Sequence, residues 1–299
     1  MLNVLLVGYG RMGVLHYEAI NKSEHSKVYG IIDPNININI LNNENLKCFK
    51  DINEMNLENT EIDCVIIASS TNSHYEIAKI LLKNNIPILV EKPLCTNIEE
   101  VDELLQIRSI QNSIIRVGFI ELYNPVIKFL ENLSLDKVTK IIIRRLSKPP
   151  ESSRGLSDVL YDLTIHDVSI LDKLFELDEY TIIEKTLKKT QGLITEAYIN
   201  FDLNKIKVSL ETSINSSKKE RIWEIYTNEY IYYIDLLNIK FSKENIETKE
   251  ITNIKEFDED TSPIEQQLNN FISCVNTNND DINHIRTIEN SHKFINSLY

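Results

Sequence analysis

The feature that most constrains the fold is a glycine-rich turn near the start of the sequence, Gly8-Tyr9-Gly10-Arg11-Met12-Gly13. It follows the apolar run at residues 3–7 and opens a helical segment. Gly8 permits a tight turn, Gly10 lets the backbone approach a pyrophosphate, and Gly13 allows close packing of helix on strand. The pyrophosphate would lie at a helix N-terminus, where free amides and the helix dipole favour an anion. In this context the glycines predict a dinucleotide-binding turn.

An acidic residue stands where such a turn needs one. Asp33 ends the next β-rich run, residues 27–33, and lies 20 residues after Gly13. A carboxylate there can accept hydrogen bonds from both ribose hydroxyls of NAD and would repel the additional phosphate of NADP. The alternative is a glycine turn beside an ordinary exposed aspartate. Strand, spacing and acid together favour NAD as the cofactor, with NADP disfavoured.

Residues 1–120 alternate between apolar strands and helices. This alternation predicts a parallel sheet with right-handed crossovers, covered on both faces. Asn97 is the expected cap of the second helix, and Glu99 and Glu100 suit its first turn. The expected strands are residues 3–7, 27–33, 64–69, 87–91 and 113–119, and the clearest helices are residues 74–84 and 97–109.

Residues 121–299 have a different pattern, in which strand-like runs dominate. They predict a second α/β domain with an open, mostly antiparallel sheet and helices on one face. The expected strands are residues 140–146, 196–203, 205–214, 223–228 and 230–237. The expected helices are residues 123–133, 160–175, 262–277 and 283–297.

Composition excludes several functional classes. A formal net charge of −13 argues against a nucleic-acid partner, because phosphate contacts need clustered lysine and arginine. Four widely spaced cysteines without a Cys-x-x-Cys pair favour thiols in a reducing compartment over disulfides or zinc. The apolar N-terminus lacks a basic leader and a cleavage site, and no run approaches membrane-spanning length. We therefore expect a cytoplasmic protein without a membrane partner.

Glu91-Lys92-Pro93 follows a strand that should end at the carboxyl edge of the first sheet, where open α/β sheets bind ligands. A lysine there can stabilise an alkoxide-like oxygen while hydride leaves the neighbouring carbon. Pro93 fixes the backbone after it and can form a cis peptide bond. Taken by itself, a Lys-Pro after a strand is also compatible with a surface turn.

Asp162 and His166 are four residues apart, so on a helix they share a face. An aspartate beside a histidine can orient the ring and stabilise its charged form, which suits a base that takes a hydroxyl proton. The alternatives are a surface ion pair, worth a few tenths of a kcal/mol, and a metal site. No further ligand cluster accompanies the pair, so the sequence predicts no metal.

The glycine turn, Asp33, Thr71-Asn72-Ser73-His74, Glu91-Lys92-Pro93 and Asp162-x-x-x-His166 occur in the order found in the Gfo/Idh/MocA oxidoreductases, which the chain resembles over nearly its whole length. The resemblance implies a Rossmann domain over residues 1–120 followed by an α/β domain. It also implies NAD(P)-linked chemistry on sugars, cyclitols or sugar nucleotides, and a homodimer or homotetramer formed through the second sheet. It implies Lys92 and His166 as the catalytic pair, assisted by Asp162. The implied cofactor residues are Gly8, Gly10, Arg11, Met12, Gly13, Asp33, Ser69, Thr71, Asn72, His74 and Glu91.

A narrower resemblance concerns the substrate. Residues 117–125, Arg144-Arg145 and residues 162–167 are similar to UDP-N-acetylglucosamine 3-dehydrogenases, which oxidise a 3-hydroxyl to a ketone. It implies Tyr123, Asn124, Arg145 and Asp167 as substrate-binding residues. Arginine matches phosphate oxygens bidentately, so the candidates for a substrate diphosphate are Arg144, Arg145, Lys148, Arg154 and Arg221. The alternative is that most of these cations are solvated strand and loop residues.

Three alternatives remain open at this point. The first is a dehydrogenase of a free sugar or inositol. The second is a non-catalytic NAD-binding regulator of the same fold, which would not need a complete proton-transfer set. The third is a hydrolase of this fold that uses NAD transiently and releases a sugar without net NADH.

Overall fold

The computed structural model describes residues 1–36, 46–57, 60–133, 137–149, 157–257 and 262–299. Side chains are described throughout these ranges except at 253–256. The chain forms two compact units, residues 1–120 with 261–292, and residues 121–260 with 293–299.

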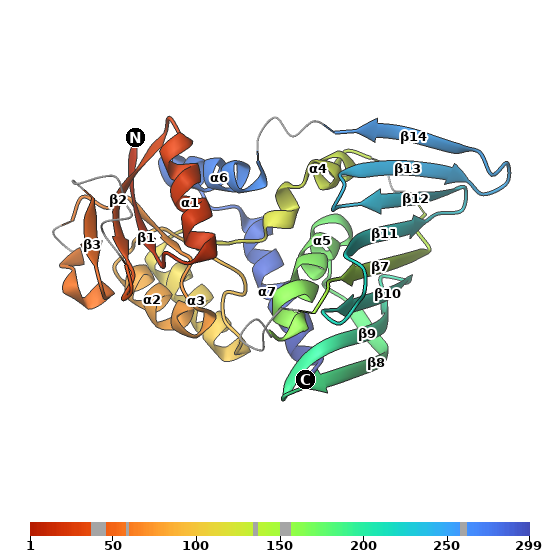
Figure 1. The fold of residues 1–299 in the computed structure, drawn as a ribbon, viewed down its shortest axis with the longest axis horizontal. Helices are drawn as coiled ribbons and strands as arrows, with labels where there is room; N and C mark the ends of the chain where they lie inside the picture. Colours follow the sequence, from red (N-terminus) through yellow and green to blue (C-terminus); the bar gives the residue numbers. More distant parts are fainter. Residues whose placement is uncertain (37–45, 58–59, 134–136, 150–156, 258–261) are drawn as a thin grey trace. The chain divides into compact units, whose positions relative to one another are not determined.

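The first unit contains a parallel sheet with strand order β3-β2-β1-β4-β5-β6 (Figure 1). Its central strands consist of apolar residues buried on both faces, as expected where helices cover a parallel sheet. The strands are β1 (Leu2–Val7), β2 (Ser26–Ile32), β3 (Lys47–Phe49), β4 (Cys64–Ile67), β5 (Ile88–Val90) and β6 (Ile115–Val117).

Helices connect these strands and cover the sheet. They are α1 (Arg11–Lys22), α2 (Thr71–Lys83) and α3 (Ile98–Gln111), with a short 3₁₀ helix at Ile52–Glu54. The predicted cap of α3 is confirmed, since the side chain of Asn97 accepts a hydrogen bond from the amide of Glu99 at 2.8 Å. The helix ends at Asn112, which adopts the left-handed conformation typical of a helix C-terminus.

Residues 261–292 belong to the first unit, whereas the sequence predicts a second domain over the whole of residues 121–299. Helix α6 (Pro263–Thr277) begins at Ser262, whose hydroxyl accepts from the amide of Glu265, and packs beside α1. Its Leu268, Phe271 and Ile272 join the core of the first sheet. This apolar face accounts for the difference, because it completes a core that β1 and β4 leave open.

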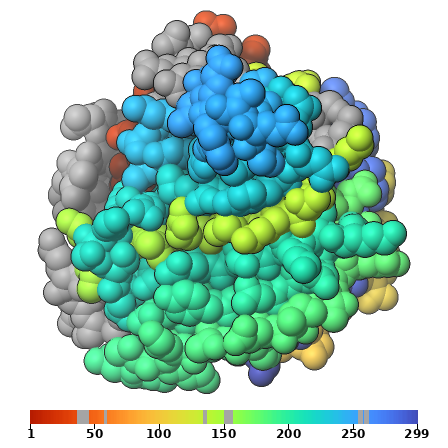
Figure 2. Space-filling model, turned by 90° about the vertical axis from the view of Figure 1, so that its right-hand side faces the viewer, coloured from red at the N-terminus to blue at the C-terminus, as the bar shows by residue number. Residues whose placement is uncertain are grey.

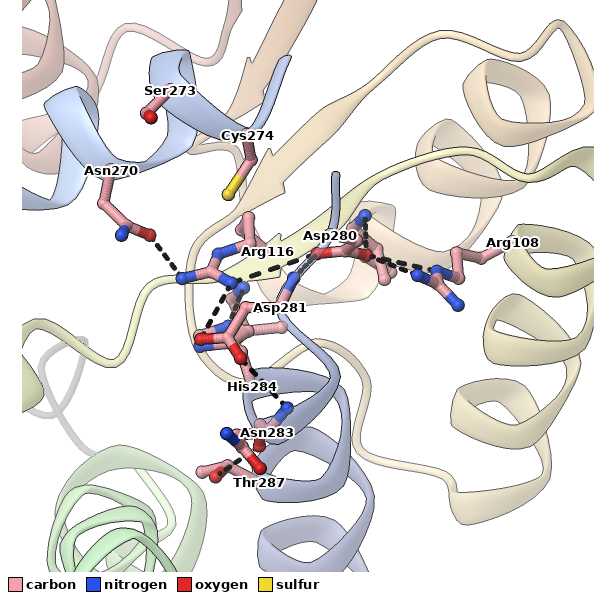
Figure 3. Close-up of polar contacts among 12 residues, drawn as sticks. Arg108, Arg116, Asn270, Ser273, Cys274, Asp280, Asp281, Asn283, His284 and Thr287 are labelled. Carbon is pink, nitrogen blue, oxygen red and sulfur yellow. Dashed lines mark hydrogen bonds and ion pairs between the residues drawn. The ribbon is translucent and has the colours of Figure 1, made fainter. Parts of the chain in front are cut away.

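Polar side chains from the chain's end also complete the edge strand β6 (Figure 3). The carboxylate of Asp280 accepts from the amide of Ile115 at 3.3 Å and pairs with Arg108 at 3.0 Å. Nε2 of His284, on α7 (Ile282–Ser297), accepts from the amide of Val117 at 3.0 Å. These acceptors satisfy amides that an edge strand otherwise exposes.

The second unit contains a sheet of order β14-β13-β12-β11-β7-β10-β9-β8. Neighbouring strands are antiparallel except β7 and β10, which are parallel. The strands are β7 (Lys140–Leu146), β8 (Tyr180–Thr190), β9 (Leu193–Leu203), β10 (Ile206–Ser213), β11 (Glu220–Tyr226), β12 (Tyr230–Asp235), β13 (Lys240–Asn245) and β14 (Ile251–Glu256).

Helices α4 (Pro125–Glu131) and α5 (Ile165–Phe175) lie on one side of this sheet, and a 3₁₀ helix at Ile120–Tyr123 precedes them. Figure 2 views the other face, where the strands run side by side with β7 in yellow-green across the middle. The predicted fold class, a Rossmann sheet followed by an open, mostly antiparallel sheet, is confirmed. Among the described residues, no helix has the length and apolar character needed to cross a membrane.

Candidate functional site

The glycine turn between β1 and α1 adopts a backbone that larger residues cannot follow. Gly8 has a φ of +91°, and a Cβ built on it would lie 2.5 Å from the amide nitrogen of Ser69. A Cβ on Gly13 would lie 2.1 Å from the carbonyl oxygen of Gly8. A Cβ on Gly10, by contrast, meets nothing within 4 Å. Gly8 and Gly13 therefore serve the packing of the turn, while Gly10 leaves open space at the N-terminus of α1.

Asp33 is tied directly to this turn. One carboxylate oxygen, Oδ2, accepts from the amide of Tyr9 at 2.8 Å, and Oδ1 accepts from the amide of Asn35 at 2.8 Å. The amide of Gly8 donates to the carbonyl of Ile32 at 2.8 Å. These bonds fix the acidic side chain beside the glycine turn.

A cavity of ≈ 570 Å³ lies at this end of the sheet, a size suited to a cofactor. It brings together four of the predicted cofactor residues, Gly8, Gly10, Asp33 and Ser69. Arg11 and Met12 lie in the first turn of α1, and Thr71 and Asn72 in the first turn of α2. The cavity is also lined by Lys50, Asp51 and Ile52, which the sequence analysis missed because the short strand β3 before them gives no clear signal.

The segment Glu91–Leu94 after β5 is held by three buried histidines. The Glu91 carboxylate accepts from Nε2 of His16 at 2.8 Å. The Lys92–Pro93 peptide bond is cis, and Nδ1 of His74 lies 2.9 Å from the Pro93 carbonyl oxygen. The amide of Leu94 donates to Nε2 of His292 at 3.1 Å. The backbone on both sides of Lys92 is therefore fixed.

Two of these histidines, His74 and His292, have pKa values below the ordinary histidine value, so their protonated forms are disfavoured. Burial lowers the pKa of His74, although nearby carbonyl oxygens of Pro93 and Ser69 and the charge of Glu91 oppose this effect. Burial also lowers the pKa of His292, to about 4. Neutral rings at these two positions act as fixed structural partners rather than as proton carriers at neutral pH.

In the second unit, His166 follows an unusual helical turn. The sequence predicts one helix over residues 160–175, whereas the structure has a π-helical turn, Leu160–Thr164, leading into α5. Asp162 lies in this turn and accepts from the hydroxyl of Ser157 at 2.7 Å. His166 is buried near the start of α5. π-helical turns are rare and occur often at functional sites.

The next residue, Asp167, is the centre of a buried ionic network. It accepts from Nε of Arg145 at 2.5 Å, from a second Arg145 nitrogen at 3.0 Å, and from the indole of Trp223 at 2.9 Å. Arg145 also donates to Glu121 at 3.0 Å, and Arg221 donates to the same Glu121 oxygen at 2.7 Å. The network connects α5 with β7, β11 and the segment before α4 through charged groups that satisfy one another.

The charges in this network are strongly stabilised. Burial opposes ionisation of Arg145, but Asp167 and Glu121 outweigh it and raise the pKa of the guanidinium. Burial likewise opposes ionisation of Glu121, but Arg145 and Arg221 hold the pKa of its carboxyl below the ordinary value. Arg145 and Glu121 therefore both remain charged in the interior at neutral pH.

The four predicted substrate residues lie in different environments. Arg145 and Asp167 are buried against each other. Asn124 is buried as the cap of α4, where its side chain accepts from Val126 and donates to the carbonyl of Leu236. Tyr123 is partly exposed, with Lys128 5.8 Å above its ring.

The cationic candidates for a diphosphate also differ. Arg144 pairs with Glu224 at 2.5 Å, and Arg221 is engaged by Glu121. Lys148 is exposed. Arg154 lies outside the described residues.

The described parts of the chain contain no cluster of three or more histidine, cysteine or acidic side chains able to hold a metal ion. The first unit contains the glycine turn, the Asp33 carboxylate beside it and a lysine, Lys92, on a fixed segment. The second unit contains a buried histidine, His166, on helix α5, which the ionic network around Asp167 holds in place.

Residues 2–119 match the family described as an oxidoreductase family with an NAD-binding Rossmann fold. The myo-inositol 2-dehydrogenase of Thermotoga maritima is 29% identical over 176 residues, which are 56% of this chain and 52% of that protein. The UDP-N-acetylglucosamine 3-dehydrogenase of Acidithiobacillus ferrooxidans is 27% identical over 171 residues, 55% of this chain and 51% of that protein. In these matches the chain spans about half the length of its relatives.

The similarity of fold extends further than the similarity of sequence. The solved structure of the Acidithiobacillus ferrooxidans UDP-N-acetylglucosamine 3-dehydrogenase has a TM-score of 0.82 to this chain. The superposition covers 99% of this chain and 97% of that one, at 18% sequence identity. The two proteins therefore share both sheets and their order along the chain.

Proposed function

We propose that this chain is an NAD-dependent dehydrogenase of the Gfo/Idh/MocA type that oxidises a secondary hydroxyl of a sugar or sugar nucleotide, since residues 2–119 match the NAD-binding Rossmann fold of that oxidoreductase family. The observation that carries the proposal is the fixed position of Lys92 at the carboxyl end of β5, in the same unit as the glycine turn and Asp33. Ligands of open α/β sheets bind at this edge.

The residues present fit a dinucleotide. Gly10 has open space where a side chain would stand, at the N-terminus of a helix whose amides favour a pyrophosphate. Asp33 lines the adjacent cavity and has the chemistry to accept from ribose hydroxyls. Its negative charge supports a preference for NAD over NADP. NAD, when bound, supplies the hydride acceptor.

The side chains of the protein have complementary roles in this proposal. His166 accepts the proton of the substrate hydroxyl, and Asp162 assists by stabilising the charged ring. Lys92 stabilises the negative charge that develops on the oxygen as hydride leaves the neighbouring carbon. The oxidation yields a ketone, one proton and reduced cofactor.

Arg145 and Asp167 support His166 from within the protein. Because Asp167 is bonded to Arg145 and Trp223 and adjoins His166 in α5, the network fixes the backbone that carries the proposed base. We assign these two residues to positioning, and we keep the partly exposed Tyr123 as a substrate contact.

For the substrate we favour the 3-hydroxyl of a UDP-N-acetylhexosamine. The similarity to UDP-N-acetylglucosamine 3-dehydrogenase, in sequence and over the whole fold, supports this choice. The similarity to a myo-inositol 2-dehydrogenase makes a free cyclitol the second candidate.

The test is to incubate the purified chain with NAD and UDP-N-acetylglucosamine, myo-inositol or free hexoses, and to follow NADH at 340 nm with a ketone trap present. NADH with the sugar nucleotide alone supports the favoured substrate, and NADH with inositol supports the second. NAD binding without NADH would contradict a dehydrogenase. Release of free sugar without NADH would instead indicate a hydrolase. Formation of neither free sugar nor NADH would indicate a regulator.

We also propose that the face of the second sheet opposite α4 and α5 forms the subunit contact of a homodimer or homotetramer. On this face a hollow of ≈ 910 Å³ is lined by Arg144, Tyr233 and neighbouring residues of β11 to β13. A charge reversal there, Glu224→Lys, is expected to lower the mass measured by light scattering. A monomeric parent protein would contradict this assembly.

A further inference from the structure

The C-terminal helix α7 supplies a backbone acceptor to the segment that carries Lys92. His292 and Leu94 are separated by 198 positions in sequence, yet the Leu94 amide donates to Nε2 of His292 at 3.1 Å. Both residues belong to the first unit. Leu94 is fully buried, so its amide would lose a hydrogen bond without compensation from water if His292 were removed.

The ring of His292 is held in the one tautomer that can accept this bond. Its Nδ1 lies 2.7 Å from the carbonyl of Ile288, one turn earlier in α7, and must donate to it. Nε2 therefore carries the lone pair that faces the Leu94 amide. The Phe119 ring packs 6.4 Å away, centre to centre, which restricts rotation of the imidazole.

Lys92 lies two residues before this anchor. The intervening Pro93 contributes no amide donor, and its carbonyl is engaged by His74. The first backbone donor after Lys92–Pro93 is thus the one that His292 accepts from. On the other side, Glu91 is held by His16.

We propose that His292 is a positioning residue for Lys92: by accepting from the Leu94 amide it fixes the backbone that places the lysine for catalysis. The inference rests on the proposed role of Lys92 in stabilising the developing oxygen anion. It adds a residue from the far end of the chain to the support of that lysine. A displacement of about 1 Å in a catalytic group can cost on the order of 100-fold in rate.

The test compares His292→Leu, which removes the acceptor, with His292→Gln, whose amide oxygen can take the position of Nε2. In His292→Leu we expect kcat to fall on the order of 10- to 100-fold, with the Kd for NAD unchanged. Two readouts need no turnover: hydrogen exchange at the Leu94 amide and the rate of acetylation of Lys92, both measured by mass spectrometry. We expect both to change in His292→Leu and to return toward the parent values in His292→Gln.

His284→Leu is the matched control, because it removes the same type of acceptor from the same helix but from the amide of Val117. It should leave Leu94 exchange and Lys92 acetylation at parent values. Unchanged exchange, acetylation and kcat in His292→Leu would overturn the proposal. If that variant does not fold, rapid exchange of the Leu94 amide in the parent protein would overturn it equally.

Failure of the proposed function is a separate result. A parent protein that turns over no sugar, cyclitol or sugar nucleotide would refute the dehydrogenase. The exchange and acetylation measurements would still decide whether His292 fixes the segment around Lys92.

Discussion

Nε2 of His292 accepts a hydrogen bond from the amide of Leu94 at 3.1 Å, so the last helix of the chain holds the segment after β5. His292 is fully buried there and remains neutral, because burial lowers its pKa to about 4. An interior histidine of this kind contributes to the pH dependence of folding as well as to the position of the loop.

The first prediction concerns stability at acid pH. Between the ordinary histidine pKa of 6.5 and the folded value of about 4, the unfolded chain binds a proton at His292 and the folded chain does not. The free energy of unfolding should therefore fall as the pH decreases through this window, by up to about 3 kcal/mol from this residue. Urea unfolding between pH 7.5 and 4 measures the effect. His292→Gln should show a shallower pH dependence, and an identical one would contradict the assignment.

The glycine turn gives a second prediction with its own control. Gly13→Ala should lower the free energy of unfolding by about 3 kcal/mol or more, because its Cβ would lie 2.1 Å from the Gly8 carbonyl. Gly10→Ala has open space and should fold normally, but should weaken NAD binding by at least about tenfold, equal to 1.4 kcal/mol. Urea unfolding and titration calorimetry separate the two effects. Unimpaired NAD binding by Gly10→Ala would argue against a pyrophosphate at this turn.

Asp33 gives a third prediction, about the choice of cofactor. Asp33→Ala should weaken NAD and reduce discrimination against NADP by about tenfold, since the negative charge beside the ribose is removed. Asp33→Asn keeps one acceptor for the amides of Tyr9 and Asn35, and so controls for distortion of the turn. The Kd values for both cofactors provide the comparison. A ratio of Kd values equal to that of the parent in both variants would exclude the ribose role.

The ionic network around Asp167 gives a fourth prediction. Arg145→Leu leaves Asp167 buried without its bidentate partner, and should lower the free energy of unfolding by about 3–5 kcal/mol. Trp223 is the single tryptophan and donates to Asp167, so its fluorescence reports on the network directly. Arg145→Lys should be intermediate, because lysine keeps the charge without the planar fork. A loss below about 1 kcal/mol, as at an exposed ion pair, would contradict a structural role for the network.

Most of the fold could be predicted because most of its strands are short apolar runs, which the spacing of apolar residues and the length of the run identify. Strand β8 was missed, since its side chains are largely exposed and it is defined by pairing with β9 rather than by burial. β13 and β14 lie at the opposite edge of the sheet and were also missed, because their sequences, KFSKEN and ITNIKE, contain few apolar residues. The sequence also could not predict which sheet α6 packs against, because an apolar helix face does not identify the core that it joins.

Site residues could be predicted from the sequence where they belong to a local motif. They could not be predicted where they depend on contacts between residues far apart in the sequence. The glycine turn, Asp33 and Lys92 stand beside strand ends and follow from local spacing. His16 lies on the buried face of α1, between Gly13 and Ala19, and a polar residue at such a position is a usable signal. The partners of His284 and His292 lie more than 160 residues away, so no local pattern could identify them.

The central claim is hydride transfer to NAD with His166 as the base, and isotope transfer tests it most directly. UDP-N-acetylglucosamine carrying deuterium at C3 is incubated with NAD, and the reduced cofactor is analysed by mass spectrometry. We predict deuterium in the NADH from the parent protein, and a rate lower by about 10²–10⁴-fold in His166→Ala with NAD binding preserved. NADH without deuterium would place the oxidation at another carbon. An unimpaired rate in His166→Ala would contradict the assignment of the base.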